Sequence, residues 1–164
     1  MRRLAALAAL PGVVLLAGLL AAPASAAPPA RSPATEVCEP MVRNAVEASL
    51  GSPLPGPQLG AWSGRTYTCT YPLGGGQLVL RVDDLRTKGR ARAAYRRQSR
   101  ATRGRTRLNG LGNAAYQAGD GTLVALKDQF VLAVDPSAAP PAIRKADLAF
   151  AATLAVMGCW AGGT

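Results

Sequence analysis

Between Pro40 and Gly51 the apolar residues recur at intervals of three and four, which places them on one face of a helix. Proline is tolerated in the first turn of a helix and glycine is favoured just past its end. We therefore predict a helix over residues 40–50. The next stretch, residues 51–64, contains three prolines and four glycines, which predicts a surface loop with Trp62 as its one residue in the core.

A two-residue alternation replaces the helical pattern farther along the chain. Residues 66–71 alternate threonines with two tyrosines and a cysteine, which predicts a strand with two different faces. Three glycines at 74–76 predict a turn into a second strand over residues 77–85, so the two strands form a β-hairpin. Three shorter strands, separated by two tight turns, are predicted over residues 114–118, 122–126 and 129–134.

Helical spacing returns in two further segments. In residues 88–102, alanines and Tyr95 recur on one side and arginines on another, which predicts an amphipathic helix. A double proline at 140–141 opens the last segment, where apolar residues follow the helical repeat over 143–157 and Gly158 fits the end.

The resulting order of elements, α-ββ-α-βββ-α, predicts a protein of the α+β class. Short turns between successive strands require antiparallel neighbours, so we expect one antiparallel sheet of about five strands. We expect the apolar faces of the three helices to cover one side of this sheet. Residues 37–160 have the length of one domain, and we predict a single domain there.

The N-terminus has the layout of a cleavable signal peptide over residues 1–26. Arg2 and Arg3 precede an apolar run, and the small residues of a cleavage site end at Ala26. Residues 27–36 are rich in proline and alanine and have no periodicity, which predicts a flexible leader. We therefore expect a secreted protein that could associate with the cell envelope. We expect no lipid anchor, because no cysteine directly follows the apolar run.

The chain contains three cysteines, Cys38, Cys69 and Cys159, and an oxidising compartment favours pairing. Of the three conceivable intramolecular pairs we favour Cys38 with Cys69. The first stands at the start of the first helix, and the second lies on the strand face against which that helix would pack. The closed loop would contribute about 3–4 kcal/mol. Cys159 would then be a small buried apolar residue, which we prefer, or a thiol that is free or linked to another chain.

The search for reaction chemistry produces exclusions. The chain has no histidine, which excludes Ser-His and Cys-His nucleophilic pairs and most zinc sites. Asp83 and Asp84 are neighbours on a strand and point to opposite faces, so they cannot act together at one bond. The glycines of the 110–115 segment resemble a dinucleotide-binding pattern, but a strand follows them, so Gly110 and Gly112 are predicted to form a structural turn. We predict no catalytic residue, no metal site and no cofactor.

The segment from Arg86 to Arg107 is the most unusual feature, because it carries ten basic residues and no acidic one. The formal net charge is +10, and loss of Arg2 and Arg3 with the signal peptide leaves +8. Arginine binds phosphate and carboxylate groups through paired hydrogen bonds, so the segment is a candidate anion-binding surface. The competing interpretation, which the composition favours, is a solvated helix face enriched in arginine by a GC-rich genome. The candidate anion-binding residues are Arg92, Arg96, Arg97, Arg100 and Arg103.

Four short motifs follow one another along the chain: Cys38 before the first helix, Leu50-Gly51 at its end, Cys69-Thr70-Tyr71 in the first strand, and Gly110-Leu111-Gly112-Asn113-Ala114-Ala115 before the later strands. In this arrangement the chain from Val37 to Met157 resembles an actinobacterial domain of unknown function. That domain occurs in secreted proteins and lipoproteins and is related to extracellular sensor domains of membrane serine/threonine kinases. The resemblance implies an antiparallel sheet covered by helices, a disulfide between Cys38 and Cys69, and residence outside the cell or in its envelope. It implies no established activity.

These observations predict a noncatalytic module that binds a ligand or partner through a basic helix. The expected partner is an anionic polymer of the cell envelope, lipid headgroups or an envelope protein. Sequence-specific nucleic-acid binding is not expected, because the protein is exported and only Tyr95 is aromatic in the basic segment. Two alternatives are a cationic effector that acts on membranes and an enzyme that works without histidine, which we disfavour. No transmembrane anchor is expected after cleavage.

Overall fold

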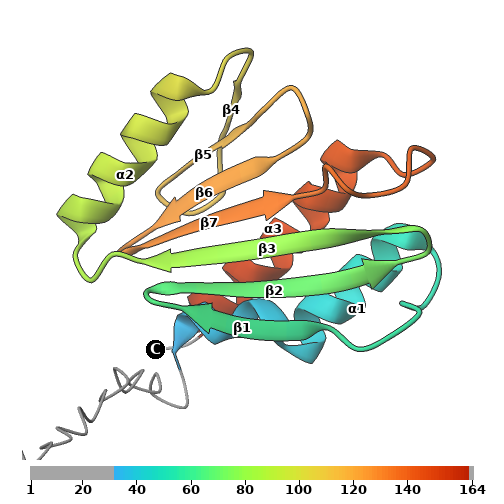
Figure 1. The fold of residues 1–164 in the computed structure, drawn as a ribbon. Coiled ribbons are helices and arrows are strands. Elements are labelled where there is room, and N and C mark those ends of the chain that lie inside the picture. The colour runs from blue at the N-terminus through green and yellow to red at the C-terminus, as the bar shows by residue number, and fades with distance from the viewer. Residues whose placement is uncertain (1–31, 163–164) are drawn as a thin grey trace, which may run out of the picture.

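The computed structural model describes residues 32–162, which form helices and strands in one sheet (Figure 1). The α+β class is confirmed. The predicted signal peptide over residues 1–26 lies outside the described residues. The helices are the short 3-10 helix η1 (Pro33–Cys38) and the α-helices α1 (Pro40–Leu50), α2 (Lys88–Ala101) and α3 (Lys145–Gly162). The strands are β1 (Leu59–Ser63), β2 (Thr66–Leu73), β3 (Gly76–Asp84), β4 (Thr106–Leu108), β5 (Ala114–Gln117), β6 (Leu123–Lys127) and β7 (Phe130–Asp135).

The first two α-helices lie close to their predicted spans of residues 40–50 and 88–102. α1 begins at Pro40 and ends before Gly51, which adopts the left-handed conformation at a φ of 67°. α2 begins after Thr87, whose hydroxyl accepts a hydrogen bond from the backbone N–H of Arg90 at 3.2 Å. Local sequence signals therefore set the ends of both helices.

α3 differs from the prediction at its C-terminal end. Gly158 does not end the helix, which continues to Gly162. A glycine inside a helix costs only about 1 kcal/mol, and tertiary contacts hold the turn that follows. The indole N–H of Trp160 donates to the carbonyl of Pro33 at 2.7 Å, and its ring lies 5.5 Å from that of Phe130, centroid to centroid.

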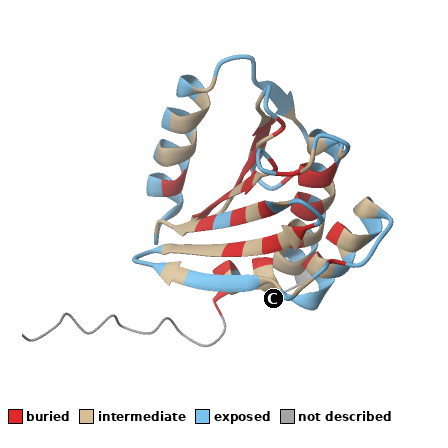
Figure 2. Ribbon diagram, turned by 45° about the vertical axis from the view of Figure 1, so that its right-hand side comes forward, coloured by how far each residue is buried: buried red, intermediate tan, exposed pale blue. Residues whose placement is uncertain are grey.

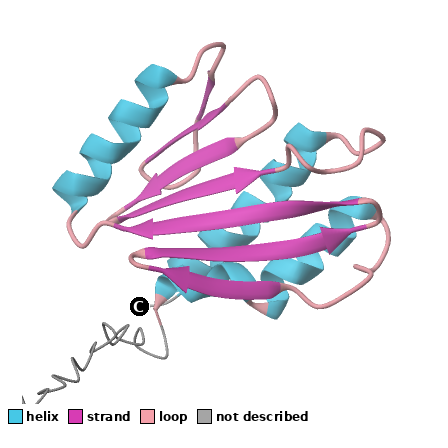
Figure 3. Ribbon diagram, viewed as in Figure 1, coloured by secondary structure: helices cyan, strands magenta, loops and turns pink. Residues whose placement is uncertain are grey.

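The sheet has seven strands in the order β1-β2-β3-β7-β6-β5-β4, and every neighbouring pair is antiparallel (Figure 3). The predicted count of about five is therefore too low, because β1 and β4 at the two edges are additional. β1 lies within the predicted loop, yet it pairs with β2 from Leu59 opposite Thr70 to Ser63 opposite Thr66. Its residues are mostly exposed, so burial imposes no alternation on its sequence (Figure 2). Trp62 is the half-buried exception and packs against the core.

The helices pack on both faces of the sheet, which corrects the expectation that all three lie on one side. η1, α1 and α3 enclose the main core, which includes Tyr71, Leu80 and Leu132. α2 packs on the opposite face against β6 and β7 (Figure 1). There it encloses a smaller cluster, here named the α2 core, which consists of Ala91, Tyr116, Val124, Leu126 and Val131.

A disulfide between Cys38 and Cys69 connects the end of η1 to β2, with the two Cα atoms 5.6 Å apart. A second connection lies close by, where the hydroxyl of Tyr71 donates to the carbonyl of Val37 at 2.6 Å. Both links join the N-terminal segment to the sheet on the face that holds the main core. The predicted disulfide between the start of the first helix and the strand is thus confirmed.

η1 also changes the picture of the leader predicted over residues 27–36. Residues 33–36 belong to this helix and are not a flexible segment. The side chain of Ser32 caps the helix by accepting from the N–H of Ala34, and Ala34 is fully buried. Burial of small apolar residues orders this proline-rich stretch. The sequence does not reveal this burial, because the stretch has no periodic apolar pattern.

Candidate anion-binding site

The basic segment lies on α2 and on the chain that follows it. Ala91 is the only fully buried residue of α2, so most of the helix surface faces solvent (Figure 2). Arg103 is exposed in the loop after the helix. Arg96 is the only one of the five candidate residues that lines the cleft described below. The four candidates exposed on α2 itself are Arg92, Arg96, Arg97 and Arg100.

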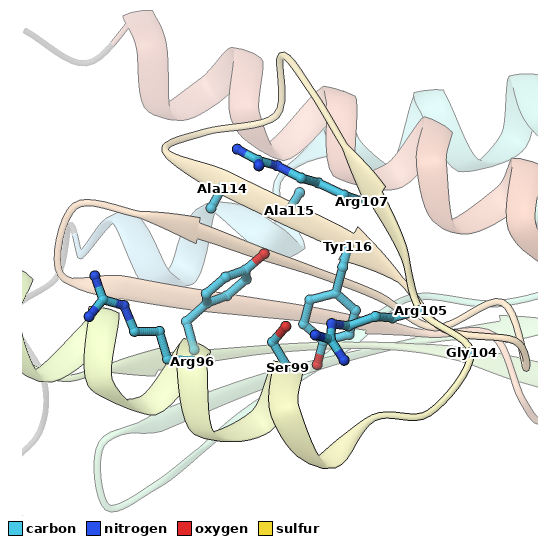
Figure 4. Close-up of a pocket in the computed structure, with 9 residues that line it drawn as sticks. Arg96, Ser99, Gly104, Arg105, Arg107, Ala114, Ala115 and Tyr116 are labelled. Atoms are coloured by element: carbon cyan, nitrogen blue, oxygen red, sulfur yellow. The ribbon is translucent and has the colours of Figure 1, made fainter.

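An open cleft of about 860 Å³ lies between α2 and the β4–β5 edge of the sheet. Figure 4 shows Arg96 and Ser99 on α2, and Arg105 and Arg107 on the segment across the cleft. Guanidinium groups therefore approach the cleft from two sides. The lining residues are Tyr95, Arg96, Ser99, Gly104, Arg105, Arg107, Ala114, Ala115 and Tyr116.

Strand register explains why Arg107 belongs to this cleft. Arg107 lies directly opposite Tyr116 in the β4–β5 pair, and opposed residues share one face of a sheet. Tyr116 belongs to the α2 core, so Arg107 also lies on the α2 side. The next residue, Leu108, lies opposite Ala115 and packs against the main core instead. A three-residue edge strand thus places one arginine toward α2 and one leucine toward the main core.

Two tyrosines form the aromatic part of the cleft. The rings of Tyr95 and Tyr116 lie 5.6 Å apart, centroid to centroid, at an interplanar angle of 55°. The hydroxyls of Tyr116 and Thr102 are 3.3 Å apart, and Arg105 donates to the carbonyl of Thr102 at 3.2 Å. These contacts join the end of α2 to β5 and fix the base of the cleft.

The phenol of Tyr95 stays protonated and can donate a hydrogen bond. Burial raises its pKa above the ordinary value, and Tyr116 raises that pKa further, while Arg107 and Arg105 lower it. A protonated phenol beside guanidinium groups adds a neutral donor to a set of charged donors. Both the phenol and the guanidinium groups are donors, so together they favour an anionic ligand with several acceptor oxygens.

The arginines of this region have no acidic partner within residues 32–162. None of the eight arginines from Arg90 to Arg107 forms an ion pair there. Lys88 differs, because its Nζ lies 2.9 Å from a carboxylate oxygen of Asp128, and this hydrogen bond lowers the pKa of Asp128. The charge on the remainder of α2 is therefore not balanced by the described part of the chain.

Most of these charges do not stabilise the helix that carries them; the exception is Arg100, which lies in the last turn, where positive charge favours the helix dipole. Arg92, Arg96 and Arg100 follow one another at four-residue spacing, and each like-charge pair at this spacing costs about 0.2–0.5 kcal/mol. Arg90 and Lys88 lie in the first turn, where positive charge opposes the helix dipole. Their presence is thus not explained by the stability of α2.

Gly110 and Gly112 lie in the turn that leads into β5. Their φ angles are 81° and 60°, in the region that favours glycine. A Cβ on Gly112 would lie 2.5 Å from the carbonyl oxygen of Leu126, so the backbone approach itself requires glycine. Asn113 closes the turn, because its N–H donates to that carbonyl at 2.7 Å and its side-chain oxygen accepts from the N–H of Asp128 at 2.6 Å.

The other reactive groups do not assemble into a second centre. Asp83 accepts from the hydroxyl of Thr66 at 2.7 Å, and Asp84 accepts from the N–H of Arg86 at 2.9 Å, so both make local structural contacts. The described part of the chain holds no group of three histidine, cysteine or acidic residues that could bind a metal ion. None of its helices is long and apolar enough to span a membrane.

Cys159 is the one free cysteine among the described residues. It is partly exposed, and its sulfur lies 3.9 Å from the sulfur of Met41. Burial raises the pKa of its thiol, and the charge of Glu36 raises that pKa further. The preferred prediction of a buried apolar residue is therefore only half met, because the side chain packs against the main core without being enclosed.

Comparison with known proteins does not add to this site. No family model, curated protein or solved structure matches the chain. Eight of the nine lining residues were not sequence-based candidates, and those with a guanidinium or phenol group are Tyr95, Arg105, Arg107 and Tyr116. Alternation in the last part of the basic segment could have indicated Arg105 and Arg107, but the pairing partner of β4 was needed to show which face they share.

Proposed function

We propose that this protein is a noncatalytic binding module of the extracellular space or cell envelope, and that it binds an anionic ligand in the cleft between α2 and β4–β5. One observation carries the proposal: three arginines, Arg96, Arg105 and Arg107, line one cleft without an acidic partner in residues 32–162. Guanidinium groups without an acidic partner are free to form strong hydrogen bonds with phosphate or carboxylate oxygens of a ligand.

The composition of the cleft supports binding in preference to catalysis. Its lining consists of arginines, tyrosines, a serine, a glycine and alanines, and it contains no carboxylate. A general base is therefore lacking, because arginine stays protonated and burial keeps the phenol of Tyr95 protonated. The same lining can hold an anion through charge and hydrogen bonds.

The proposed location rests on independent features. The Cys38–Cys69 disulfide is compatible with an oxidising compartment. The layout of residues 1–26 and the resemblance to a secreted domain favour export. Under this proposal the folded domain itself, through its cationic surface, holds the protein to an anionic partner outside the cell.

Calorimetric titration with inorganic tripolyphosphate at low salt tests the cleft. The double variant R96Q/R107Q removes one guanidinium from each side, and we expect about tenfold weaker binding, since exposed charge pairs contribute at most about 1 kcal/mol each. The control of equal charge is R65Q/R144Q, at exposed positions outside the cleft. Arg144 differs from the cleft arginines in one respect, because its Nε lies 3.0 Å from a carboxylate oxygen of Asp147. Equal weakening in both variants, or binding that R96Q/R107Q leaves unchanged, would refute the cleft as the site.

A further inference from the structure

We infer that the natural ligand is a linear polyanion that lies along α2 and enters the cleft, and not a single small anion. The inference rests on the function proposed above and extends it to the arginines that the cleft does not use. These unused residues are Arg90, Arg92, Arg97, Arg100 and Arg103, all of them exposed. A single phosphate in the cleft would leave their charge without a counterpart.

The arrangement of three arginines supplies a track for such a chain. Arg92, Arg96 and Arg100 are spaced four residues apart, so they form one row on the helix, here named the arginine row. Successive members are separated by about 6 Å along the helix axis. Arg96 belongs both to this row and to the cleft lining. The row therefore passes the cleft at its middle member, and a ligand with repeated negative charges can follow the row and contact the cleft at Arg96.

The apolar surface of the molecule argues against insertion into a membrane at this place. The exposed large apolar residues among the described ones are Met41, Leu59, Phe150 and Leu154, and none of them lies on α2. A helix that binds at a lipid interface needs an apolar face free to enter it. α2 instead uses its apolar side, with Ala91 and Tyr95, against the sheet. Its free surface is cationic and polar, which suits a hydrated polymer.

The test compares inorganic phosphate chains of increasing length, from orthophosphate through tripolyphosphate to long-chain polyphosphate. We measure binding to the purified protein with its disulfide intact, at several salt concentrations. The row variant R92Q/R100Q removes two arginines outside the cleft, and R65Q/R144Q is the control of equal charge. Phosphatidylglycerol vesicles provide a lipid surface of the same phosphate chemistry.

We expect the affinity per phosphate unit to rise about tenfold from tripolyphosphate to the long chain, because further contacts become intramolecular. R92Q/R100Q should weaken long-chain binding, leave tripolyphosphate binding unchanged, and reduce the slope of log K against log salt by about 1.4, or about 0.7 for each lost contact. The control should change neither the affinity nor the slope beyond the general effect of its charge.

The outcomes separate the inference from the proposed function. Equal affinity per phosphate at every chain length would refute the inference of a polymeric ligand but not the proposed anion site in the cleft. Long-chain binding that R92Q/R100Q leaves unchanged would do the same. If the protein binds vesicles more tightly than the long chain at equal phosphate concentration, and R92Q/R100Q abolishes that binding, the ligand is a lipid surface and the inference of a polymer is refuted. Tripolyphosphate binding that R96Q/R107Q leaves unchanged would refute the proposed anion site in the cleft.

Discussion

The two faces of the sheet differ in how they are covered and in the charge that they carry. The face of the main core is closed by η1, α1 and α3 and carries the Cys38–Cys69 disulfide. On the opposite face, α2 is the only helix among residues 32–162 that packs against the sheet, and it does so over β6 and β7 around the five buried side chains of the α2 core. The first face has many apolar contacts, whereas the second carries most of the charge that the described chain leaves unpaired.

This difference shows how a small domain can carry a surface that opposes its own stability. Repulsion among the arginines of α2 costs a few tenths of a kcal/mol for each close pair. Such a cost is tolerable when burial elsewhere supplies the stability, because each large apolar side chain contributes about 1.5–3 kcal/mol. The main core thus supplies the stability that offsets the repulsion among the charges of α2.

The largest effect on stability is expected from substitution of two leucines on one strand, which belong to different cores. Leu123 belongs to the main core and Leu126 to the α2 core, and both lie on β6. We expect Leu123→Ala to lower the free energy of unfolding by about 4 kcal/mol and Leu126→Ala by about 2.5 kcal/mol, since the thinner cluster can relax around the cavity. Urea unfolding measures both. Equal losses would show that the two faces contribute alike.

Removal of the disulfide should have the next largest effect. Replacing Cys38 and Cys69 together by alanine opens a loop with a sequence separation of 31, which we expect to lower the free energy of unfolding by about 3.5 kcal/mol in the chain-entropy model. Urea unfolding of the double variant under nonreducing conditions measures the loss. Cys159→Ala is the control and should change the free energy of unfolding far less. A loss below about 1 kcal/mol for the double variant would mean that noncovalent packing of η1 suffices.

Neutralising the arginine row should have the smallest effect on stability and the opposite sign. R92Q/R100Q removes the two like-charge pairs with Arg96, but it also removes Arg100 from the last turn, where positive charge favours the helix dipole. We therefore expect the free energy of unfolding to rise by only about 0.3 kcal/mol at low salt. Added salt should erase the gain, because it screens the repulsion in the parent protein. Urea unfolding with and without added salt measures both values. A loss of stability would show that these arginines serve the fold.

Much of the fold follows from local pattern. The helix over residues 40–50 and the hairpin of β2 and β3 are predicted with their boundaries close to those observed. The two missed strands, β1 and β4, are edge strands whose residues are mostly exposed, so the apolar alternation of a half-buried strand is lacking in both. Their identity as strands depends on the partners β2 and β5.

The candidate site could be predicted only in part for the same reason. The concentration of arginine in residues 86–107 points to this region directly. It does not show that Arg96 lines the same cleft as Arg105 and Arg107, because the position of α2 on the sheet results from the packing of Ala91 and its neighbours. Tyr116 has no local signal of a ligand role, since a tyrosine on a strand ordinarily serves packing.

Local patterns in the sequence predict the α+β class, the main helices and the cationic character of one segment, because periodicity, end residues and charge are local properties. They favour Cys38 with Cys69 among three conceivable cysteine pairs, and the structure confirms that pair. Only the tertiary structure decided that α2 lies on the opposite face from α1 and α3, that the sheet extends to seven strands, and that three arginines share a cleft. Those outcomes depend on strand register and on which apolar surfaces meet. Contacts between residues distant in the chain set both.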